Sequence, residues 1–586
     1  MSAPCAPRLA LVMGDPAGIG PELFVRLLAE PAVREGAALV GIGDARVLAR
    51  GIEQAGLDPE LVVERDREAA LAAAAPGRPA FWDRGDCDPA DCPPARVSPA
   101  AGAAALTAFR AALELAREGK VDAITFTPFN KQAIRLVHPA YEDEAVEAAW
   151  LAQKRLMALN LEKRNALIGA MREAAVANAR LLAEMAVRET GMGRADDKTA
   201  KNLLAARKTP GTEDLHTGAY SGDHGLTITE QAPFGVIAAI TPVTNPIATI
   251  VNNSIGMVAA GNSVVFCPHP SARSSCNKAV EILHRAIVEA GGPPHVLTTL
   301  ADPSIEKASE LMRHRRVNLI VATGGPGVVR AALSSGKKAI GAGAGNPPVV
   351  VDETADIPKA AGDIVAGAGF DNNLPCIAEK VLIAVAGVAD TLLEQLRRHG
   401  ALVVPSHWVE KLTGTVFTEV TEEVTSSGGA GHNPRRRWVL NKQWVGKDAR
   451  VILEAAGFSI PGDVRLAVVE VGRDHPLVQE EQLMPVLPLV RAKNVDEAIE
   501  LAVEVEHGYR HTAVMHSKHV DHMTRLARAI QTTLFVKNAP SYAGIGLGGE
   551  GFTSFTIAGP TGEGLTSARC FTRQRRCTLV DALSIV

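Results

Sequence analysis

One cysteine of the chain stands in a setting that suits a nucleophile. Cys376 follows a polar Asp-Asn-Asn stretch and a proline in FDNNLPCIAEK (370–380), and the residues after it favour a helix. A reactive cysteine needs access to substrate, a route to its thiolate and N–H donors that can hold an oxyanion. On these residues alone a buried structural cysteine is the better interpretation, because free cysteine is among the most buried residue types.

A glycine-rich turn at 323–327 has the composition of a phosphate-binding site. Its sequence, Thr-Gly-Gly-Pro-Gly, follows a predicted strand and begins a predicted helix. Glycines let the backbone approach a pyrophosphate, and a helix N-terminus favours an anion. The turn lacks the GxGxxG fingerprint, so by itself it indicates an ordinary connection between strand and helix.

A run of histidines near the C-terminus raises the question of a metal site. Their spacing matches none of the common zinc patterns, and we find no carboxylate or cysteine that completes one. We interpret them as packing and surface histidines and expect no metal. They are His507, His511, His516, His519 and His522.

The elements that must position these residues follow an α/β pattern. Between 142 and 190 apolar residues recur at three-, four- and seven-residue spacings, which predicts long helices with one face toward a core. These residues are Ile168, Met171, Ala175, Leu182 and Met185. A hairpin is predicted over 215–233. Beyond it, short apolar runs alternate with helices and predict a parallel, doubly wound sheet; they lie at 236–240, 264–266, 318–322, 349–351 and 381–385.

Composition limits the classes of partner. Of 586 residues, 61 are basic and 65 acidic, and the net charge of −4 gives no reason to expect nucleic acid or an anionic membrane. No apolar run approaches the ~20 residues that span a bilayer, and no secretory signal is apparent. Cys87 and Cys92 are interpreted as structural thiols. We expect a cytoplasmic protein.

The motifs around Cys376 together resemble one family. FDNNLPC matches the nucleophile motif of the aldehyde dehydrogenase superfamily. Its neighbours are similar to the CoA-acylating branch, which includes the ethanolamine- and propanediol-utilisation enzymes of bacterial microcompartments. The resemblance runs from about residue 145 to the C-terminus, with motifs in the same order. The neighbouring motifs are ITPVTNP (240–246), VATGGPG (321–327), GAGAGNPPVVVDETAD (341–356) and KNAPSYAGIGLGGEG (537–551).

The resemblance implies a role for each matching residue. Cys376 attacks an aldehyde carbonyl to form a hemithioacetal, whose oxyanion is held by the side-chain amide of Asn245 and the backbone N–H of Cys376. Hydride transfer to a nicotinamide then leaves a thioester on Cys376, and Glu481 holds the nicotinamide ribose. The other implied cofactor-binding residues are Thr241, Pro242, Pro268, His269, Thr323, Gly324, Gly325, Gly327 and Gly341.

Two departures from the hydrolytic aldehyde dehydrogenases bear on the reaction. GAGA (341–344) stands where those enzymes carry the glutamate of Glu-Leu-Gly-Gly, so water lacks its usual general base. A CoA thiol ionises more readily than water, which favours thiolysis over hydrolysis. CPHP (267–270) replaces the usual ribose-contacting Lys-Pro-Ser-Glu. The acylating relatives imply NAD, and NADP stays open.

The N-terminal segment contains three further motifs, VMGDPAGIGPEL (12–23), PAAGAAALTAF (99–109) and TPFNKQAI (127–134). These pieces resemble a different family, the 4-hydroxythreonine-4-phosphate dehydrogenases of pyridoxal phosphate biosynthesis. That family holds a divalent metal with three histidines, the first in Gly-His-Thr-Glu, whereas this chain reads HPAYEDEAVE (138–147). We expect a truncated, catalytically inactive segment, in which Asp15, Asn130 and Lys131 could still bind a phosphate-bearing ligand, although a structural role is favoured.

The expected architecture is an α/β aldehyde dehydrogenase fold behind this truncated α/β segment. Subunits of the superfamily pair through a β element, so a homodimer or homotetramer is expected. The expected parts are the N-terminal segment (1–142), a Rossmann-like cofactor domain (143–345) that includes the 215–233 hairpin, a catalytic domain (346–560) and an oligomerisation strand in 561–586.

The expected reaction converts a short-chain aldehyde, CoA and NAD⁺ to acyl-CoA and NADH. Acetaldehyde and propionaldehyde are the expected substrates, and microcompartment shell or cargo proteins are candidate partners. Two alternatives stay open. Gly341 argues against a hydrolytic aldehyde dehydrogenase that yields a free acid. Joint retention of Cys376, Asn245 and Glu481 argues against an inactive structural protein.

Overall fold

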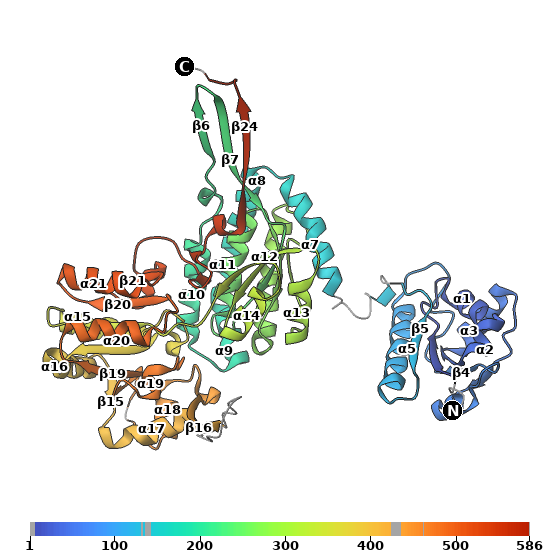
Figure 1. The fold of residues 1–586 in the computed structure, drawn as a ribbon, viewed down its shortest axis with the longest axis horizontal. Coiled ribbons are helices and arrows are strands. Elements are labelled where there is room, and N and C mark those ends of the chain that lie inside the picture. Colours follow the sequence, from blue (N-terminus) through green and yellow to red (C-terminus); the bar gives the residue numbers. More distant parts are fainter. Residues whose placement is uncertain (1–5, 131–132, 135–141, 423–434, 461, 585–586) are drawn as a thin grey trace, which may run out of the picture. The chain divides into compact units, whose positions relative to one another are not determined.

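The structure is a computed structural model that describes residues 6–130, 133–134, 142–422, 435–460 and 462–584. The chain divides into two compact units, 1–141 and 142–586 (Figure 1). Lys131 lies outside the described residues. Among the described helices, none is long and apolar enough to cross a membrane.

The first unit is built around a parallel sheet with the strand order β3-β4-β2-β1-β5. Its central strands are continuous apolar runs, as expected for strands covered on both faces. The strands are β1 (Arg8–Val12), β2 (Ala38–Gly43), β3 (Val62–Glu64), β4 (Ala80–Asp83) and β5 (Ala123–Phe126). The helices are α1 (Gly20–Ala29), α2 (Pro31–Gly36), α3 (Ala45–Ala55), α4 (Arg67–Ala73) and α5 (Pro99–Arg117).

The second unit begins with a five-stranded parallel sheet that we call the cofactor sheet. Its order is β10-β9-β8-β11-β12, so the first strand in sequence lies at the centre and the order reverses there. Ligands of open α/β sheets bind at the carboxyl ends of the strands beside such a reversal. The strands are β8 (Val236–Ile240), β9 (Ser263–Cys267), β10 (Leu297–Thr299), β11 (Val317–Thr323) and β12 (Lys338–Ala342).

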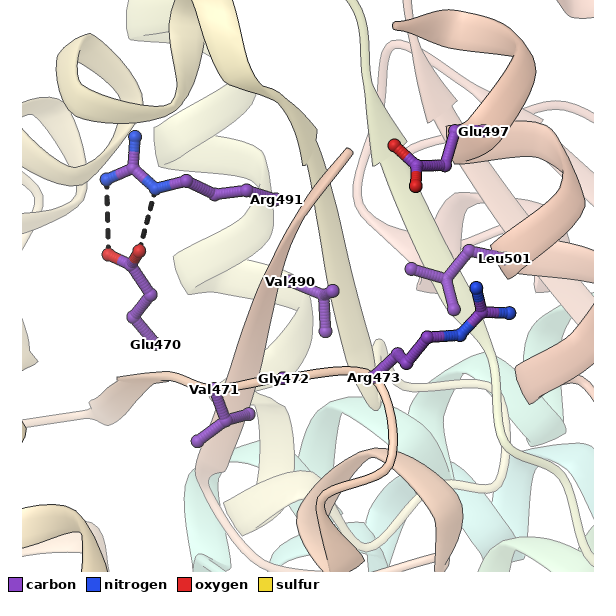
Figure 2. A pocket seen from close by; sticks show the side chains of 8 residues that line it. All are labelled: Glu470, Val471, Gly472, Arg473, Val490, Arg491, Glu497 and Leu501. Carbon is purple, nitrogen blue, oxygen red and sulfur yellow. Dashed lines mark hydrogen bonds and ion pairs between the residues drawn. The ribbon is translucent and has the colours of Figure 1, made fainter. Parts of the chain in front are cut away.

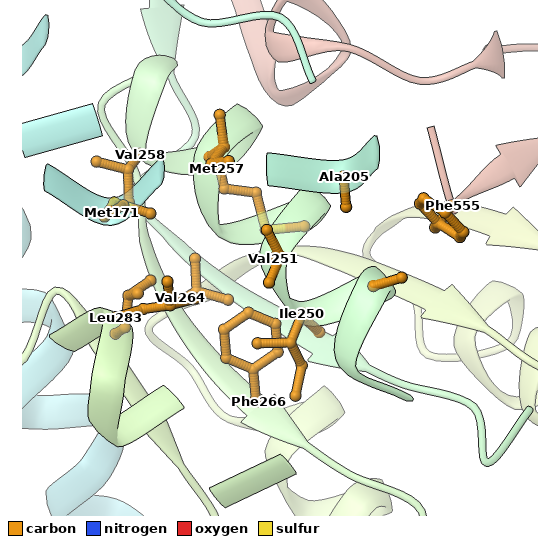
Figure 3. Close-up of a cluster of buried hydrophobic side chains, with 14 of the residues drawn as sticks. Met171, Ala205, Ile250, Val251, Met257, Val258, Val264, Phe266, Leu283 and Phe555 are labelled. Carbon is orange, nitrogen blue, oxygen red and sulfur yellow. The ribbon is translucent and has the colours of Figure 1, made fainter. Parts of the chain in front are cut away.

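Alternation along the strands buries both faces of the cofactor sheet. On β8, Ile237 and Ala239 face one hydrophobic cluster, whereas Val236 and Ala238 face another. The first cluster contains the fully buried Phe266 and is covered by helices on that face (Figure 3). Burial of one such side chain contributes about 1.5–3 kcal/mol to the free energy of folding. The packed clusters therefore fix the positions of the strand ends. The helices of this part are α7 (Glu142–Met157), α8 (Leu161–Ala177), α9 (Ala179–Thr190), α10 (Ala195–Lys208), α11 (Pro246–Ala259), α12 (Arg273–Glu289), α13 (Ile305–Arg313) and α14 (Pro326–Leu333).

The five apolar residues expected on one helical face lie on two helices. Helix α8 carries the first three and α9 the last two, and four of the five are buried. The helices meet at Asn178, whose Nδ2 donates to the carbonyl of Ala174 at 2.8 Å. The expectation of one continuous face is wrong, because an asparagine that bonds to the preceding turn competes with continuation of the helix.

A seven-stranded parallel sheet, the catalytic sheet, follows in the order β15-β18-β19-β14-β13-β20-β21. The strands are β13 (Pro348–Val351), β14 (Val381–Val385), β15 (Ala401–Val403), β18 (Leu466–Glu470), β19 (Val486–Ala492), β20 (Thr512–His516) and β21 (Leu534–Lys537). The helices are α15 (Ile357–Ala368), α16 (Ala386–Arg398), α17 (Val409–Val416), α18 (Ala449–Ala455), α19 (Pro476–Gln479), α20 (Val495–Val505) and α21 (Val520–Ile530).

Three antiparallel strands project from the second unit (Figure 1). Their order is β24-β7-β6, which pairs the C-terminal strand with a hairpin more than three hundred residues earlier. Most residues of β24 are exposed, and Tyr220 of β6 is 67% exposed. An exposed ribbon with free edges is a surface on which another strand can pair. The strands are β6 (Gly218–Gly222), β7 (Gly225–Pro233) and β24 (Thr572–Val580).

Candidate active site

Cys376 is carried by a tight turn between α15 and β14. The turn starts with three consecutive left-handed residues, Asp371, Asn372 and Asn373, with φ of 47°, 55° and 62°. Asparagine and aspartate tolerate this conformation better than other residues with a Cβ, because their side chains bond to nearby backbone. Asn373 Nδ2 donates to the carbonyls of Ala368 at 2.8 Å and Glu379 at 2.9 Å. The Asp-Asn-Asn sequence therefore holds the shape of the loop that presents Cys376.

In the resting protein, Cys376 is a protonated thiol. Burial, together with the carboxylate of Glu481, raises the pKa of Cys376 to about 12. The charges of Lys380 and Lys201 act in the opposite direction. The thiol is therefore protonated near neutral pH, and its attack on a carbonyl requires that the proton be removed.

Lys380 lies beneath this loop. Its Nζ donates to Asn373 Oδ1 at 2.6 Å, to the Asn373 carbonyl at 2.8 Å and to the Pro375 carbonyl at 3.2 Å. Burial lowers the pKa of Lys380 to about 8, which leaves it charged at neutral pH. It thus places a positive charge close to Cys376 and anchors the carbonyl of the residue before it.

Gly345 brings three segments of the site together. Its N–H donates to Glu481 Oε1 at 3.4 Å. A Cβ at this position would lie 2.9 Å from the carbonyl oxygen of Cys376 and 2.9 Å from Cγ of His511. Only a residue without a side chain allows Cys376 and His511 to approach in this way.

His511 is a buried neutral base at this junction. Burial lowers its pKa to about 4, with a smaller effect from the charge of Lys380. Its Nδ1 pairs with Thr512 Oγ1 at 2.8 Å, while Nε2 has no partner among the described residues. The sequence pattern predicts only a packing or surface histidine here, and its proximity to Cys376 follows from the structure alone.

Asn245 lies between the cofactor sheet and the cysteine loop. It follows β8, precedes the first residue of α11 and is buried. Its Oδ1 accepts a hydrogen bond of 2.5 Å from Lys201 Nζ, and its Nδ2 is 3.4 Å from Thr244 Oγ1. The sequence prediction did not include Lys201.

The remaining implied cofactor residues gather at the carboxyl edge of the cofactor sheet. Thr241 and Pro242 follow β8, and Pro268 and His269 follow β9. Thr323 ends β11, and Gly324 follows it. Because neighbouring parallel strands end at one edge, all these residues lie beside the reversal of strand order.

The glycine turn after β11 fits the phosphates of a dinucleotide. Gly325 precedes the first residue of α14, and a Cβ at Gly325 or Gly327 would meet open space among the described residues. The first turn of a helix offers unpaired N–H groups and a positive dipole end to an anion. Thr323 is different, because its Oγ1 pairs with Thr556 Oγ1 at 2.9 Å.

Gly341 is buried under α14. A Cβ there would lie 2.7 Å from Val329 Cγ1, and the N–H of Gly341 donates to Thr561 Oγ1 at 3.2 Å. The position therefore has no room for a glutamate in the present packing.

A surface hollow of about 440 Å³ lies elsewhere, along β18 and β19 (Figure 2). Arg491 on its wall donates to both carboxylate oxygens of Glu470, at 2.7 and 3.2 Å, and to Asp390. Arg473 pairs with Glu504. The cations of this wall are thus neutralised by neighbouring carboxylates, and the hollow contains none of the residues gathered around Cys376.

Two residues of the first unit that were considered for phosphate binding, Asp15 and Asn130, accept hydrogen bonds from nearby backbone N–H groups. Asp15 is 3% exposed, and its Oδ1 accepts from the N–H of Ala17 at 2.9 Å. Asn130 Oδ1 accepts from the N–H of Ala133 at 3.3 Å. Across the described part of the chain, no three His, Cys, Asp or Glu side chains are placed to hold a metal.

Comparison with known families covers both units. The model of the aldehyde dehydrogenase family matches residues 120–419 and 449–555. A second model, pyridoxal phosphate biosynthetic protein PdxA, matches residues 35–177. These matches confirm the expected fusion of a PdxA-like segment with an aldehyde dehydrogenase fold.

Individual relatives are similar over most of their own length. The acetylating acetaldehyde dehydrogenase EutE of Salmonella typhimurium is 50% identical over 445 residues, which cover 76% of this chain and 92% of EutE. The structure of Rhodopseudomonas palustris propionaldehyde dehydrogenase with bound CoA and an acylated cysteine is 51% identical, with a TM-score of 0.71, over 76% of this chain and 98% of that chain.

A third relative comes from a bacterial microcompartment. The propionaldehyde dehydrogenase of the Clostridium phytofermentans fucose utilisation microcompartment is 50% identical, with a TM-score of 0.71, over 76% of this chain and 98% of that chain. These relatives confirm the expected fold and the resemblance to CoA-acylating enzymes. The chain belongs to the aldehyde dehydrogenase family, in its CoA-acylating branch.

Proposed function

We propose that the chain oxidises acetaldehyde or propionaldehyde to the corresponding acyl-CoA, with Cys376 as the residue that carries the acyl group. One observation carries this proposal: the half-buried Cys376 lies near the neutral ring of His511, and position 341 is a glycine without a carboxylate. Relatives named as acetylating or propionaldehyde dehydrogenases support the substrate class.

The first step is attack of the Cys376 sulfur on the aldehyde carbon. Because the pKa of the thiol is about 12, a proton acceptor must act at the same time. His511 is neutral at pH 7, its Nε2 has no partner among the described residues, and its Cγ and the Cys376 carbonyl oxygen both lie close to Gly345. We assign to His511 the acceptance of the thiol proton of Cys376 or of incoming CoA while the sulfur bonds to carbon, because a ring with a pKa of about 4 is too weak a base to ionise the free thiol beforehand.

The oxygen of the resulting hemithioacetal carries negative charge. We assign its stabilisation to Nδ2 of Asn245 and the backbone N–H of Cys376. Hydrogen-bond donors already held in place in a water-poor site stabilise such an oxyanion strongly, and loss of one donor typically costs about 10²–10³ in kcat. Lys201 and Lys380 add positive charge nearby.

A nicotinamide cofactor supplies the hydride acceptor that converts the hemithioacetal to a thioester. The turn from Gly324 to Gly327 would hold its pyrophosphate at the N-terminus of α14. Thr241, Pro242, Pro268 and His269 would line its path along the sheet edge, and Glu481 would bind a ribose. We propose NAD and leave NADP open, since the segment after β9 has neither the usual lysine nor the usual glutamate.

Release of the acyl group requires a thiol rather than water. A hydrolytic enzyme needs a base that activates water, and the position of that base is occupied by Gly341, packed against Val329. CoA brings its own ionisable thiol, so transfer from Cys376 gives acyl-CoA.

The exposed strands and the relatives of the chain also suggest its assembly and its location. We propose a homodimer or homotetramer that pairs through β24, β7 and β6, because these strands expose free edges. We also propose a cytoplasmic location, with packaging in a microcompartment and contact with its shell or cargo proteins, on the basis of the Clostridium relative. We propose that the first unit is catalytically inactive.

Intact-mass spectrometry tests the acyl carrier. Protein incubated with propionaldehyde and NAD⁺ in the absence of CoA should gain the mass of one propionyl group on Cys376, and CoA should remove it. Cys376→Ser should gain no such mass. An acyl group that survives CoA, or that forms in the variant, would contradict the proposal.

A further inference from the structure

A buried cluster of charges lies behind Asn245, and the chemistry proposed above does not explain it. Lys198 and Lys201 of α10 both form ion pairs with the carboxylate of Asp371, the Lys198 pair at 3.0 Å. All three residues are buried, with exposed fractions of 3%, 2% and 0%. Burial of ions costs several kcal/mol each unless the geometry is good, so such a cluster calls for a reason beyond stability.

Lys201 makes one contact that Lys198 does not. Its Nζ donates to Oδ1 of Asn245 at 2.5 Å, whereas Lys198 Nζ donates to the Thr244 carbonyl at 3.1 Å. An ammonium group is a donor without an acceptor, so it can pair only with the oxygen end of an amide. The NH₂ end of Asn245 must then point away from Lys201.

The same aspartate joins this contact to the cysteine loop. Asp371 is the first left-handed residue of the turn that carries Cys376. Its Oδ1 accepts from the N–H of Arg194 at 2.7 Å, and its own N–H donates to Asp197 Oδ2 at 2.9 Å. The Cys376 loop and the Asn245 amide therefore share one anchor, through Asp371 and Lys201.

We propose that Lys201 is a positioning residue for the oxyanion hole, which fixes the amide of Asn245 with Nδ2 toward the reacting carbonyl. This inference rests on the proposed role of Asn245. In the absence of Lys201, the amide of Asn245 can rotate and present its oxygen to a negatively charged intermediate, which repels it. The positive charge of Lys201 also polarises the amide and strengthens its N–H donors.

The ammonium group of Lys201 keeps its charge although it is buried. Burial lowers the pKa of Lys201 to about 8, and the charge of Asp371 opposes this decrease. Lys198 and Asp197 also act on the charge of Lys201, and that charge in turn acts on the thiol of Cys376. Lys201 is thus charged at neutral pH, in surroundings where a single charge acts strongly on its neighbours.

A double-mutant cycle on the full chain tests the inference. The variants are Lys201→Met, Asn245→Ala and the double variant, measured for kcat and KM with propionaldehyde, NAD⁺ and CoA. Asn245→Ala should lower kcat about 10²–10³-fold, and Lys201→Met about tenfold or more with the KM for CoA little changed. In the double variant, Lys201→Met should add less than about threefold, because the amide it positions is gone.

Two further variants separate positioning from stability. Lys198→Met removes the other buried cation of Asp371, and it should lower the melting temperature as Lys201→Met does. Lys198→Met should lower kcat less than Lys201→Met does. Combined with Asn245→Ala, it should lower kcat by the product of the two separate factors, as expected for independent effects. Lys201→Gln keeps an N–H donor near Asn245 and should retain about tenfold more kcat than Lys201→Met.

Each outcome bears on one claim. Equal costs of Lys201→Met in the wild type and in Asn245→Ala would overturn the positioning role, as would equal rates for Lys201→Gln and Lys201→Met. An Asn245→Ala enzyme with unchanged kcat would instead overturn the proposed oxyanion role of Asn245. Should Lys201→Met fail to fold, Lys201→Ala, which also removes the ammonium group, takes its place in the cycle, and the same additivity would overturn the proposal.

Discussion

Gly345 stands between Cys376 and His511, and a methyl group on it would lie 2.9 Å from both the Cys376 carbonyl oxygen and the His511 ring. The same glycine donates its N–H to Glu481. The backbone of Cys376, the neutral ring of His511 and the carboxylate of Glu481 thus meet at one residue with no side chain. The geometry of the site depends on close packing at this point as much as on its reactive groups.

Gly345→Ala should damage both stability and catalysis. The added methyl group must displace either the Cys376 backbone or the His511 ring, at a cost of about 1–3 kcal/mol. Gly343→Ala is the matched control, because a Cβ there meets only Pro560 Cγ, at 3.8 Å. Thermal melts and kcat should separate the two variants, and equal behaviour would argue against tight packing at Gly345.

Gly341→Glu should not convert the chain to a hydrolytic enzyme. The new side chain would start 2.7 Å from Val329 Cγ1, so it must disturb α14 rather than reach the acyl group. We expect a lower melting temperature and no NADH formation without CoA. CoA-independent turnover in this variant would show that the position can hold a working base.

Two charges should shift the reactivity of Cys376 in opposite directions. The carboxylate of Glu481 raises the pKa of the thiol and the ammonium of Lys380 lowers it. At pH 7, where Lys380 is charged, Glu481→Gln should therefore raise the rate of iodoacetamide alkylation of Cys376, and Lys380→Met should lower it. Rate changes of the same sign in both variants would contradict the arrangement of these charges.

His511 should make the folded state sensitive to acid. Its pKa falls from 6.5 to about 4 on folding, so between these values the unfolded chain binds more protons than the folded one. The stability contributed by neutral His511 is present above pH 6.5 and is lost as the pH falls toward 4. Urea unfolding of His511→Gln should show a flatter dependence on pH in this window than the wild type, and an identical slope would argue against a buried neutral histidine.

Five strands of the two sheets could be predicted from the sequence, because a strand buried on both faces is a continuous apolar run; they are β8, β9, β11, β13 and β14. The predicted 236–240 and 381–385 coincide with β8 and β14. Periodicity failed at Asn178, where apolar spacing continues through a break between two helices. Spacing reports which side of a helix is buried, and it does not detect a local backbone bond that ends the helix.

Within the site, sequence motifs identified Cys376 and Asn245 but not the groups that support them. Lys201 and Asp371 are 170 residues apart in the chain, and their ion pair depends on how α10 packs against the cysteine loop. His511 was one of several histidines without a metal pattern. Only the fold reveals that its ring contacts the position of Gly345.

The central claim is that Cys376 passes an acyl group to CoA rather than to water. The most direct test is NADH formation from propionaldehyde and NAD⁺, with and without CoA, in the wild type and in Cys376→Ala. Multiple turnovers should require both CoA and Cys376, with at most one equivalent of NADH in the absence of CoA. Sustained turnover without CoA, or turnover in the alanine variant, would contradict the account.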